Sequence, residues 1–179
     1  MKRFSVPLTV FAVVAIVALL SAPAFAEHGY VGVDACKMCH KKEKTGDQYG
    51  SWSESKHANA FDALGSDKAK EVASAKGIAN PQEAPECLKC HVTAPGVDAS
   101  LLGKKYKVED GVGCESCHGP GKDYKNIKIM KDRDQAVANG LIIPNEDVCK
   151  KCHNEESPTY VEFNFEEKAA QIAHPIPSK

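Results

Sequence analysis

One short pattern accounts for every cysteine of this 179-residue chain. The pattern is C-x-x-C-H, two cysteines separated by two residues and followed directly by a histidine. It occurs at 36–40, 87–91, 114–118 and 149–153, so the eight cysteines form four pairs with none left over. This pattern is typical of covalent haem c attachment, in which both thiols form thioether bonds to the porphyrin and the histidine binds the iron. The sequence therefore predicts four covalently bound haem c groups.

The motifs name the residues of each predicted site. The thioether-forming residues are Cys36, Cys39, Cys87, Cys90, Cys114, Cys117, Cys149 and Cys152, and the proximal iron ligands are His40, His91, His118 and His153. Paired cysteines also occur in zinc sites of the ribbon type and in the disulfides of small exported scaffolds. Neither of these uses requires a histidine after each pair, so the fourfold pattern favours haem.

The first 26 residues have the organisation of a secretory signal peptide. Lys2 and Arg3 form a positive start, residues 6–20 are mainly apolar, and small residues lead up to Ala26. We expect cleavage after Ala26, a mature tetrahaem cytochrome c domain over 27–179, and a periplasmic or extracellular location. The apolar stretch is short for a membrane-spanning helix, so no stable membrane anchor is expected.

The composition agrees with a core built around porphyrin. Hydrophobic residues make up 42% of the chain, and the leader holds many of them, so the mature domain is poor in apolar side chains. Four haem groups would supply the missing buried surface, and without haem we expect no folded domain. The formal net charge is −1, and removal of Lys2 and Arg3 makes it more negative. This charge argues against a nucleic-acid partner.

Apolar periodicity and capping residues predict a mainly α protein with long loops, a small multihaem cytochrome fold with a haem-dominated core. We expect helices over 49–64, from a cap at Ser66 or Asp67 to Lys76, over 131–139 up to Gly140, through the fourth motif from a cap at Asn145 or Asp147, and over 165–173. A strand pattern is present only over 104–109.

The number of histidines limits the ligands on the far side of each iron. The chain has seven histidines, and four are proximal ligands, which leaves His28, His57 and His174. Four haems with two histidines each would require eight. At least one haem must therefore have methionine, another weak ligand, water or nothing in the distal position. The sequence does not decide whether the chain forms a homo-oligomer. An oligomer would not change this count, because sharing ligands between chains leaves the number of histidines per chain unchanged.

Several local signatures resemble, in the same order, those of the tetrahaem cytochrome c-554 family. They are S-W-S-E-S-K-H-A-N-A-F (51–61), C-L-K-C-H-V (87–92), G-V-G-C-E-S-C-H-G-P-G (111–121), and F-N-F-E-E (163–167) ahead of a late histidine. The resemblance implies a mainly helical protein that transfers electrons through closely packed haems. It also implies that His57 is the distal ligand opposite His153 and that His174 is the distal ligand opposite His118. The haem held by His91 would be five-coordinate.

The chain departs from the family's pattern at the first haem. The family supplies a distal histidine shortly after the third motif, where this chain has no histidine between Lys122 and Met130. Three ligands stay open for the haem held by His40. They are His28 of the same chain, His28 of a neighbouring molecule, and Met130, which would raise the potential of that haem.

These observations favour an exported electron carrier over an enzyme. We expect electrons to pass by hopping between haems, from a low-potential donor to another cytochrome or a terminal reductase. One alternative is a reductase of a small nitrogen species, nitric oxide or hydroxylamine, at the five-coordinate haem. A second alternative is a subunit of an extracellular filament whose haems form a continuous wire.

Overall fold

The structure is a computed structural model of the chain and describes residues 28–175. The predicted signal peptide lies outside the described residues, so cleavage after Ala26 stays a prediction. Residues 28–175 form helices and loops without any strand, apart from an isolated parallel bridge between Tyr30 and Leu102. The predicted mainly α fold is thereby confirmed. Within the same residues, no helix has the length and apolar character that crossing a membrane requires.

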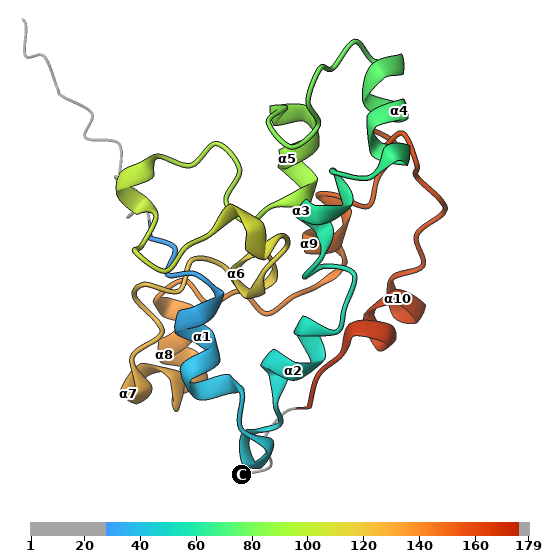
Figure 1. Ribbon diagram of the computed structural model, residues 1–179. Helices are drawn as coiled ribbons and strands as arrows, with labels where there is room; N and C mark the ends of the chain where they lie inside the picture. Colours follow the sequence, from blue (N-terminus) through green and yellow to red (C-terminus); the bar gives the residue numbers. More distant parts are fainter. Residues whose placement is uncertain (1–27, 176–179) are drawn as a thin grey trace, which may run out of the picture.

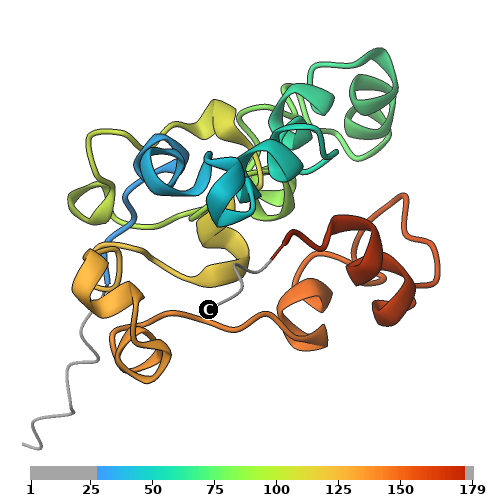
Figure 2. The ribbon, with the colours of Figure 1, turned by 90° about the horizontal axis from the view of Figure 1, so that it is seen from below.

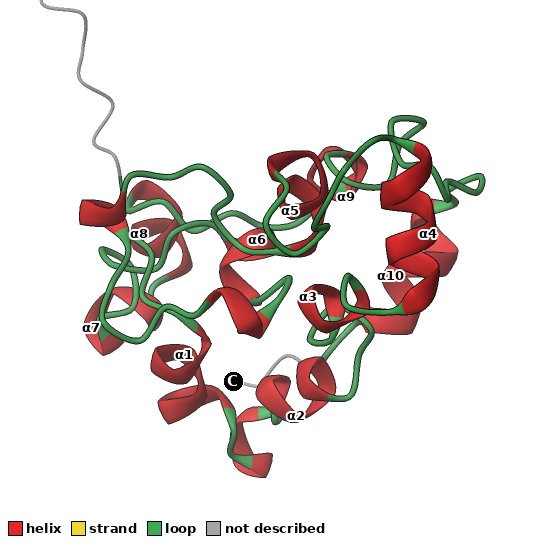
Figure 3. Ribbon diagram, turned by 45° about the horizontal axis from the view of Figure 1, so that its top comes forward, coloured by secondary structure: helices red, strands yellow, loops and turns green. Residues whose placement is uncertain are grey.

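Short helices and long loops make up the molecule, as the colouring of Figure 3 shows. The helices are α1 (Val33–His40), α2 (Gln48–Ser53), α3 (Ala60–Ala63), α4 (Asp67–Ala75), α5 (Pro85–His91), α6 (Cys114–His118), α7 (Ile127–Met130), α8 (Arg133–Ala138), α9 (Glu146–Lys150) and α10 (Phe165–Ile172), with 3-10 turns η1 (Glu43–Thr45), η2 (Ala99–Leu101) and η3 (Val108–Asp110). Helices this short are not stable by themselves in water, so tertiary contacts must hold them in place.

Helix α6 lies at the centre of the molecule (Figure 1). Seen from below, α1 to α5 form one tier, α7 to α10 lie beneath it, and α6 lies between the two (Figure 2). Helix α1 packs against both α2 and α6, α3 packs against α5, and α7 packs against α8. The third C-x-x-C-H motif, which is α6 itself, therefore occupies the position from which both tiers can be reached.

Capping side chains confirm two predicted helix starts. At the start of α4 the hydroxyl of Ser66 accepts a backbone N–H at 3.2 Å, and at the start of α9 the side-chain oxygen of Asn145 accepts one at 3.2 Å. These contacts satisfy donors that the first turn of a helix leaves without a partner. The caps are thus Ser66 and Asn145, rather than the alternatives Asp67 and Asp147.

Two further predicted helices are confirmed with shifted ends. The helix expected over 131–139 is α8, which begins after Asp132 because that carboxylate accepts two backbone N–H groups at 3.1 Å. Gly140 follows it with a φ of 99°, a left-handed conformation that favours glycine. The helix expected over 165–173 is α10, and it begins after Asn164, which caps it at 3.0 Å.

The continuous helix predicted over 49–64 is wrong. The chain forms α2 and α3 with turns between them, and His57 lies in those turns rather than on a helix. The carbonyl oxygen of His57 accepts the N–H of Val112 at 3.0 Å, and the amide of Asn59 donates to the carbonyl oxygen of Ser55 at 3.2 Å. Polar side chains and a distant backbone segment thus take the groups that a helix would pair internally.

The strand predicted over 104–109 is also wrong. This segment forms turns that lead into η3, with hydrogen bonds from Tyr106 N–H to the carbonyl oxygen of Gly103 at 2.9 Å and from Gly111 N–H to that of Val108 at 3.1 Å. The bridge nearby ends at Leu102, so no neighbouring strand continues alongside the segment. Without a partner to pair with, the alternating pattern does not produce a strand.

The polypeptide alone buries little apolar surface. The buried apolar side chains of residues 28–175 are Val31, Val33, Leu64, Ala73, Val92, Tyr124 and Ala136. Large apolar side chains remain exposed, among them Val161 at 74%, Met38 at 64% and Ile127 at 63%. A folded domain ordinarily has one contiguous apolar core. The small core agrees with the prediction that porphyrins provide most of the buried surface.

Candidate haem sites

Three of the C-x-x-C-H motifs lie on short helices, and the fourth begins at the end of one. Helix α1 ends at His40, α5 ends at His91, α6 runs from Cys114 to His118, and α9 contains Cys149. Cys152 of the fourth motif lies in a turn just after α9, which ends at Lys150. Residues three apart are neighbours on a helix surface, so the two cysteines of each of the other three motifs present their thiols on the same side. This is the placement that two thioether bonds to one porphyrin require.

The arrangement of the cysteines does not match the zinc or disulfide alternatives. All eight are free thiols rather than paired disulfides. Within residues 28–175, no three histidine, cysteine or acidic side chains converge as they would around a metal ion. A structural zinc site needs four such ligands in a tetrahedral arrangement. Haem attachment needs only the two thiols of one motif, which the chain provides four times.

Cysteines of different motifs lie close together. A hydrogen bond to Cys114, followed by burial, raises the pKa of the Cys36 thiol. Burial, followed by the influence of Cys90, raises the pKa of Cys152 to about 12. These two contacts make the first motif a neighbour of the third, and the second motif a neighbour of the fourth.

An electrostatic influence, without a hydrogen bond, links the two neighbouring pairs. Burial, followed by the charge of Cys149, raises the pKa of Cys117. The third motif is thus a neighbour of the fourth as well as of the first. The cysteines therefore connect the motifs in the spatial order first, third, fourth, second, which differs from their order in the sequence.

Three of the four proximal histidines hold Nδ1 against an oxygen acceptor. The contacts join Nδ1 of His91 to the carbonyl oxygen of Ala60 at 2.6 Å, Nδ1 of His118 to that of Ile142 at 3.2 Å, and Nδ1 of His40 to Oε1 of Gln48 at 3.2 Å. A proton held on Nδ1 leaves the lone pair of Nε2 free to bind a metal. Sequence reasoning missed these orienting groups. Two of them are backbone oxygens, which have no signature in a sequence.

Two histidine pairs face each other at a spacing that fits a metal between them. The ring centroids of His57 and His153 are 6.0 Å apart, and those of His118 and His174 are 5.8 Å apart. Two imidazoles on opposite sides of one metal, each with a metal–nitrogen bond of about 2.0 Å, place their centroids about 6 Å apart. The structure thus brings together the two pairs that the family resemblance implied.

Burial favours the neutral form of His57, His118 and His153, which is the form that binds a metal. Burial, followed by the charge of His153, lowers the pKa of His57. Burial also lowers the pKa of His153 and is the main cause that lowers the pKa of His118. The ring of Phe163 stacks on His153 with centroids 4.7 Å apart. The F-N-F-E-E signature therefore contributes a side chain that orients a proximal histidine, a role that its pattern did not reveal.

Neither His40 nor His91 takes part in a histidine ring pair within residues 28–175. His28 instead holds Nδ1 2.6 Å from a carboxylate oxygen of Asp123, and its ring lies against Gly140. Met130 ends α7 and is half-buried. The distal ligand of the first haem therefore stays a prediction with its three candidates.

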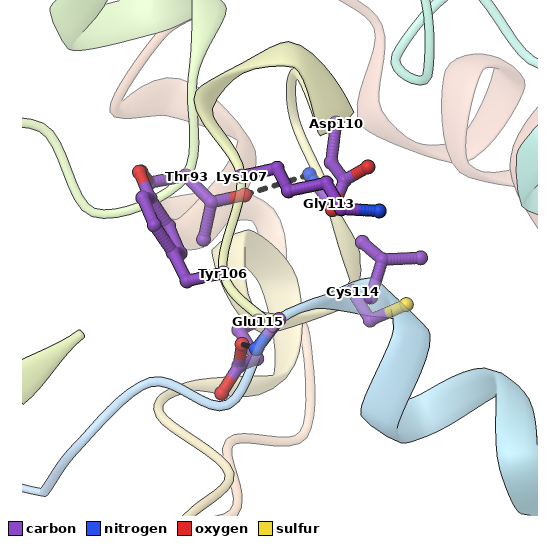
Figure 4. A pocket seen from close by; sticks show the side chains of 9 residues that line it. Thr93, Tyr106, Lys107, Asp110, Gly113, Cys114 and Glu115 are labelled. Carbon is purple, nitrogen blue, oxygen red and sulfur yellow. Dashed lines mark hydrogen bonds between the residues drawn. The ribbon is translucent and has the colours of Figure 1, made fainter. Parts of the chain in front are cut away.

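The backbone just before α6 connects several functional segments. Its carbonyl oxygen at Val112 accepts the indole N–H of Trp52 at 2.9 Å, and the N–H of Gly113 donates to the hydroxyl of Thr93 at 2.8 Å. Figure 4 shows this second contact beside Cys114 and Glu115, at a cavity of about 10 Å³. The same hydroxyl lies 2.8 Å from that of Ser116. Thr93, which follows the second motif, and Trp52, which precedes the predicted ligand His57, are thus both held by the backbone next to the third motif.

Comparison with known proteins agrees with these sites. The family model described as "Cytochrome c554 and c-prime" matches residues 35–119, which contain the first three motifs. Cytochrome c-554 of Nitrosomonas europaea is 30% identical over 148 residues, which cover 79% of this chain and 60% of that protein. The match thus spans less than two thirds of the relative's length. No solved structure matches. With its attachment motifs in the order and context of these c-type cytochromes, the chain belongs to the cytochrome c-554 family.

Proposed function

We propose that this chain is an exported tetrahaem c-type cytochrome that carries electrons between redox partner proteins. The observation that carries the proposal is the continuous order of neighbouring motifs, first, third, fourth and second, given by the hydrogen bonds and electrostatic influences between their cysteines. Thioether bonds fix each porphyrin directly beside these sulphur atoms. Neighbouring thiols therefore imply neighbouring haem edges, which is the condition for electron hopping along the whole set.

Bound haem c would supply an iron that alternates between the ferric and ferrous states by one electron. The chain's own residues hold and orient it. The cysteine pairs anchor the four groups, and the acceptors at Nδ1 direct Nε2 of the proximal histidines outward. His57 and His174 would complete two of the sites, opposite His153 and His118. Axial ligand and burial would then set the potentials.

The partners follow from this ligand set. Haems with two histidine ligands have low potentials compared with those that have methionine, so the donor would be a low-potential reductase. The acceptor would be another cytochrome or a terminal reductase. Both would meet the carrier outside the cytoplasm, in the periplasm or the extracellular space, as the leader sequence predicts. The acidic net charge gives no reason to propose a nucleic-acid partner.

Haem counting tests the proposal directly. A pyridine haemochrome assay on protein matured with the attachment machinery should give four haems per chain, retained after acid–acetone extraction because thioether bonds are covalent. Fewer than three haems, or zinc in their place, would contradict it. Reductive titration at an electrode should then show four one-electron steps, and a partner cytochrome should be reduced by the loaded protein.

The catalytic alternative rests on the proximal histidines without an opposed histidine, His40 and His91. An iron with an unfilled position can bind a small nitrogen species. Steady-state reduction of nitric oxide or hydroxylamine by the loaded protein, with an electron donor in excess, would favour that role. Electron microscopy of the purified protein tests the filament alternative, because a carrier of the proposed kind gives isolated particles.

A further inference from the structure

We propose that Glu115 sets the reduction potentials of the first and third haems through the negative charge of its buried carboxylate. This inference rests on the haem sites proposed above. Glu115 lies inside the third motif, between Cys114 and Cys117, and is only 4% exposed. A buried acidic residue ordinarily needs a partner that compensates for lost hydration. The contacts of Glu115 identify that partner and also show which haem sites the charge can reach.

Backbone N–H groups surround the carboxylate of Glu115. The N–H of Val31 donates to its two oxygens at 2.8 and 3.1 Å, that of Gly32 donates at 2.8 Å, and that of Gly121 donates at 2.6 Å. Every one of these partners is a donor, so the side chain acts only as an acceptor, which is the behaviour of an ionised carboxylate. The charge therefore remains in the interior.

No cation among the residues that the structure describes neutralises this carboxylate. The ion pairs of residues 28–175 join other side chains, and none includes Glu115. Backbone dipoles stabilise the anion but leave its net charge in place. In a buried site that charge is screened much less than it would be at the surface. Groups close to Glu115 in space therefore experience the electric field of its charge.

The effect of this charge extends to both the first and the third motif. The pKa of the Cys36 thiol is raised first by its hydrogen bond to Cys114, then by burial and by the charge of Cys114, and next by the charge of Glu115. Burial, followed by the charge of Glu115, raises the pKa of Tyr30. Figure 4 shows Glu115 between the N-terminal segment that leads into α1 and the start of α6 beside Cys114. One carboxylate thus lies next to two attachment sites.

The redox consequence follows from charge alone. One electron, supplied by the donor protein or an electrode, converts ferric to ferrous iron and removes one positive charge. No bond of Glu115 forms or breaks in this step. A fixed negative charge nearby favours the more positive oxidised state, so it lowers the potential. The first and third sites should be affected most, because Glu115 lies inside the third motif and its carboxylate accepts the N–H groups of Val31 and Gly32, which lead directly into the first motif.

The test replaces the charge in the loaded protein with Glu115→Gln, which keeps the size of the side chain. We expect two of the four potentials to rise, each by at least a tenfold change in the reduction equilibrium, which is 59 mV for one electron. The matched control is Glu109→Gln, which removes the same charge from an exposed position in η3 and should leave all four potentials unchanged. Four retained haems with unchanged potentials in Glu115→Gln would overturn the proposal.

A second variant separates charge from structure. A glutamine amide would place N–H donors against backbone N–H donors, so a loosened N-terminal segment or a loss of haem in Glu115→Gln is a structural effect that must be separated from the effect of charge. Glu115→Asp keeps the charge but shortens its reach to Val31 and Gly121. We expect lower thermal stability with potentials close to those of the original protein. A rise in Glu115→Asp equal to that in Glu115→Gln would overturn the proposal, because geometry and not charge would then set the potentials. A wild-type protein with fewer than three haems would instead contradict the proposed function.

Discussion

The contacts of Nδ1 orient three of the four histidines that are predicted to bind iron. In His91 and His118 a backbone carbonyl oxygen holds Nδ1, and in His40 the side chain of Gln48 does so. The residue types of the site could be predicted from the motif, since cysteine and histidine chemistry is specific. The orienting carbonyls and the stacking of Phe163 on His153 could not, because they depend on how distant segments fold together.

Replacement of His57 by methionine tests the opposed pair at the fourth motif. Attachment should persist, because His57 lies outside every C-x-x-C-H motif. The haem held by His153 should lose its bis-histidine spectrum and shift upward in potential, by on the order of 0.1 V within the range of about 0.8 V that axial ligands span. Electron paramagnetic resonance and a redox titration measure both effects.

The control for this change is Lys56→Met at the neighbouring exposed position. It introduces the same methionine beside His57 without removing an imidazole, so the spectrum and the potentials should stay as in the original protein. Identical titrations for both variants would mean that His57 does not bind iron.

The haem held by His91 should have an unfilled position. No histidine lies opposite His91 within residues 28–175, and the histidine count requires at least one such haem. The oxidised protein should therefore show a high-spin signal, and carbon monoxide should bind the reduced protein at this haem. Variants His28→Ala and Met130→Ala should add a second binding site only where the changed residue is the distal ligand of the first haem. A protein with every iron low-spin would contradict this prediction and remove the basis for catalysis.

At the scale of elements, the N-terminal segment, the turn before η3 and helix α6 depend on one another. Gly32 has a φ of 83°, and a Cβ there would lie 2.1 Å from the carbonyl oxygen of Lys105. Gly119 has a φ of 76°, and a Cβ there would lie 2.7 Å from the carbonyl oxygen of Gly140. The close approach of distant backbone at these glycines could not be read from local residues.

Gly32→Ala should therefore destabilise the loaded protein strongly. The change combines a strained left-handed conformation, which costs about 1–3 kcal/mol, with a collision against backbone that cannot move aside cheaply. Gly77→Ala is the control, because Gly77 has a φ of 71° but nothing lies within 4 Å of its Cβ position. That control should lose only about 1–2 kcal/mol from the strain itself. Thermal unfolding followed by circular dichroism compares the two, and equal losses would show that the contact with Lys105 does not matter.

The helices that could be predicted from the sequence are those whose ends are fixed by local contacts. Ser66 and Asn145 cap α4 and α9 with local hydrogen bonds, so neighbouring residues contained all the information needed. The segment around His57 instead follows a contact with Val112, which is far away in the sequence. Periodicity there described which side chains face inward but not whether the backbone stays helical.

At the scale of the whole molecule, the chain has many loops, short helices and few buried apolar side chains. Seven such side chains, from Val31 to Ala136, form the apolar core of residues 28–175. At about 25 cal/mol per Å² of buried apolar surface, so small a core cannot offset the conformational entropy of a domain of this length. The general architecture could be predicted from the motifs and the low apolar content, whereas the spatial order of the motifs required the fold.

The chain without haem should therefore be unfolded. Replacing the eight cysteines with serine, or producing the chain without its attachment machinery, removes the covalent cofactor while leaving the remaining sequence intact. We expect circular dichroism to show little helix and amide proton resonances to show little dispersion, whereas the loaded protein should unfold cooperatively at a much higher temperature. Two-dimensional NMR of both forms in the same buffer provides the measurement. A folded haem-free chain with a cooperative transition would mean that the polypeptide has a sufficient apolar core of its own. The porphyrins would then bind to a fold that forms without them.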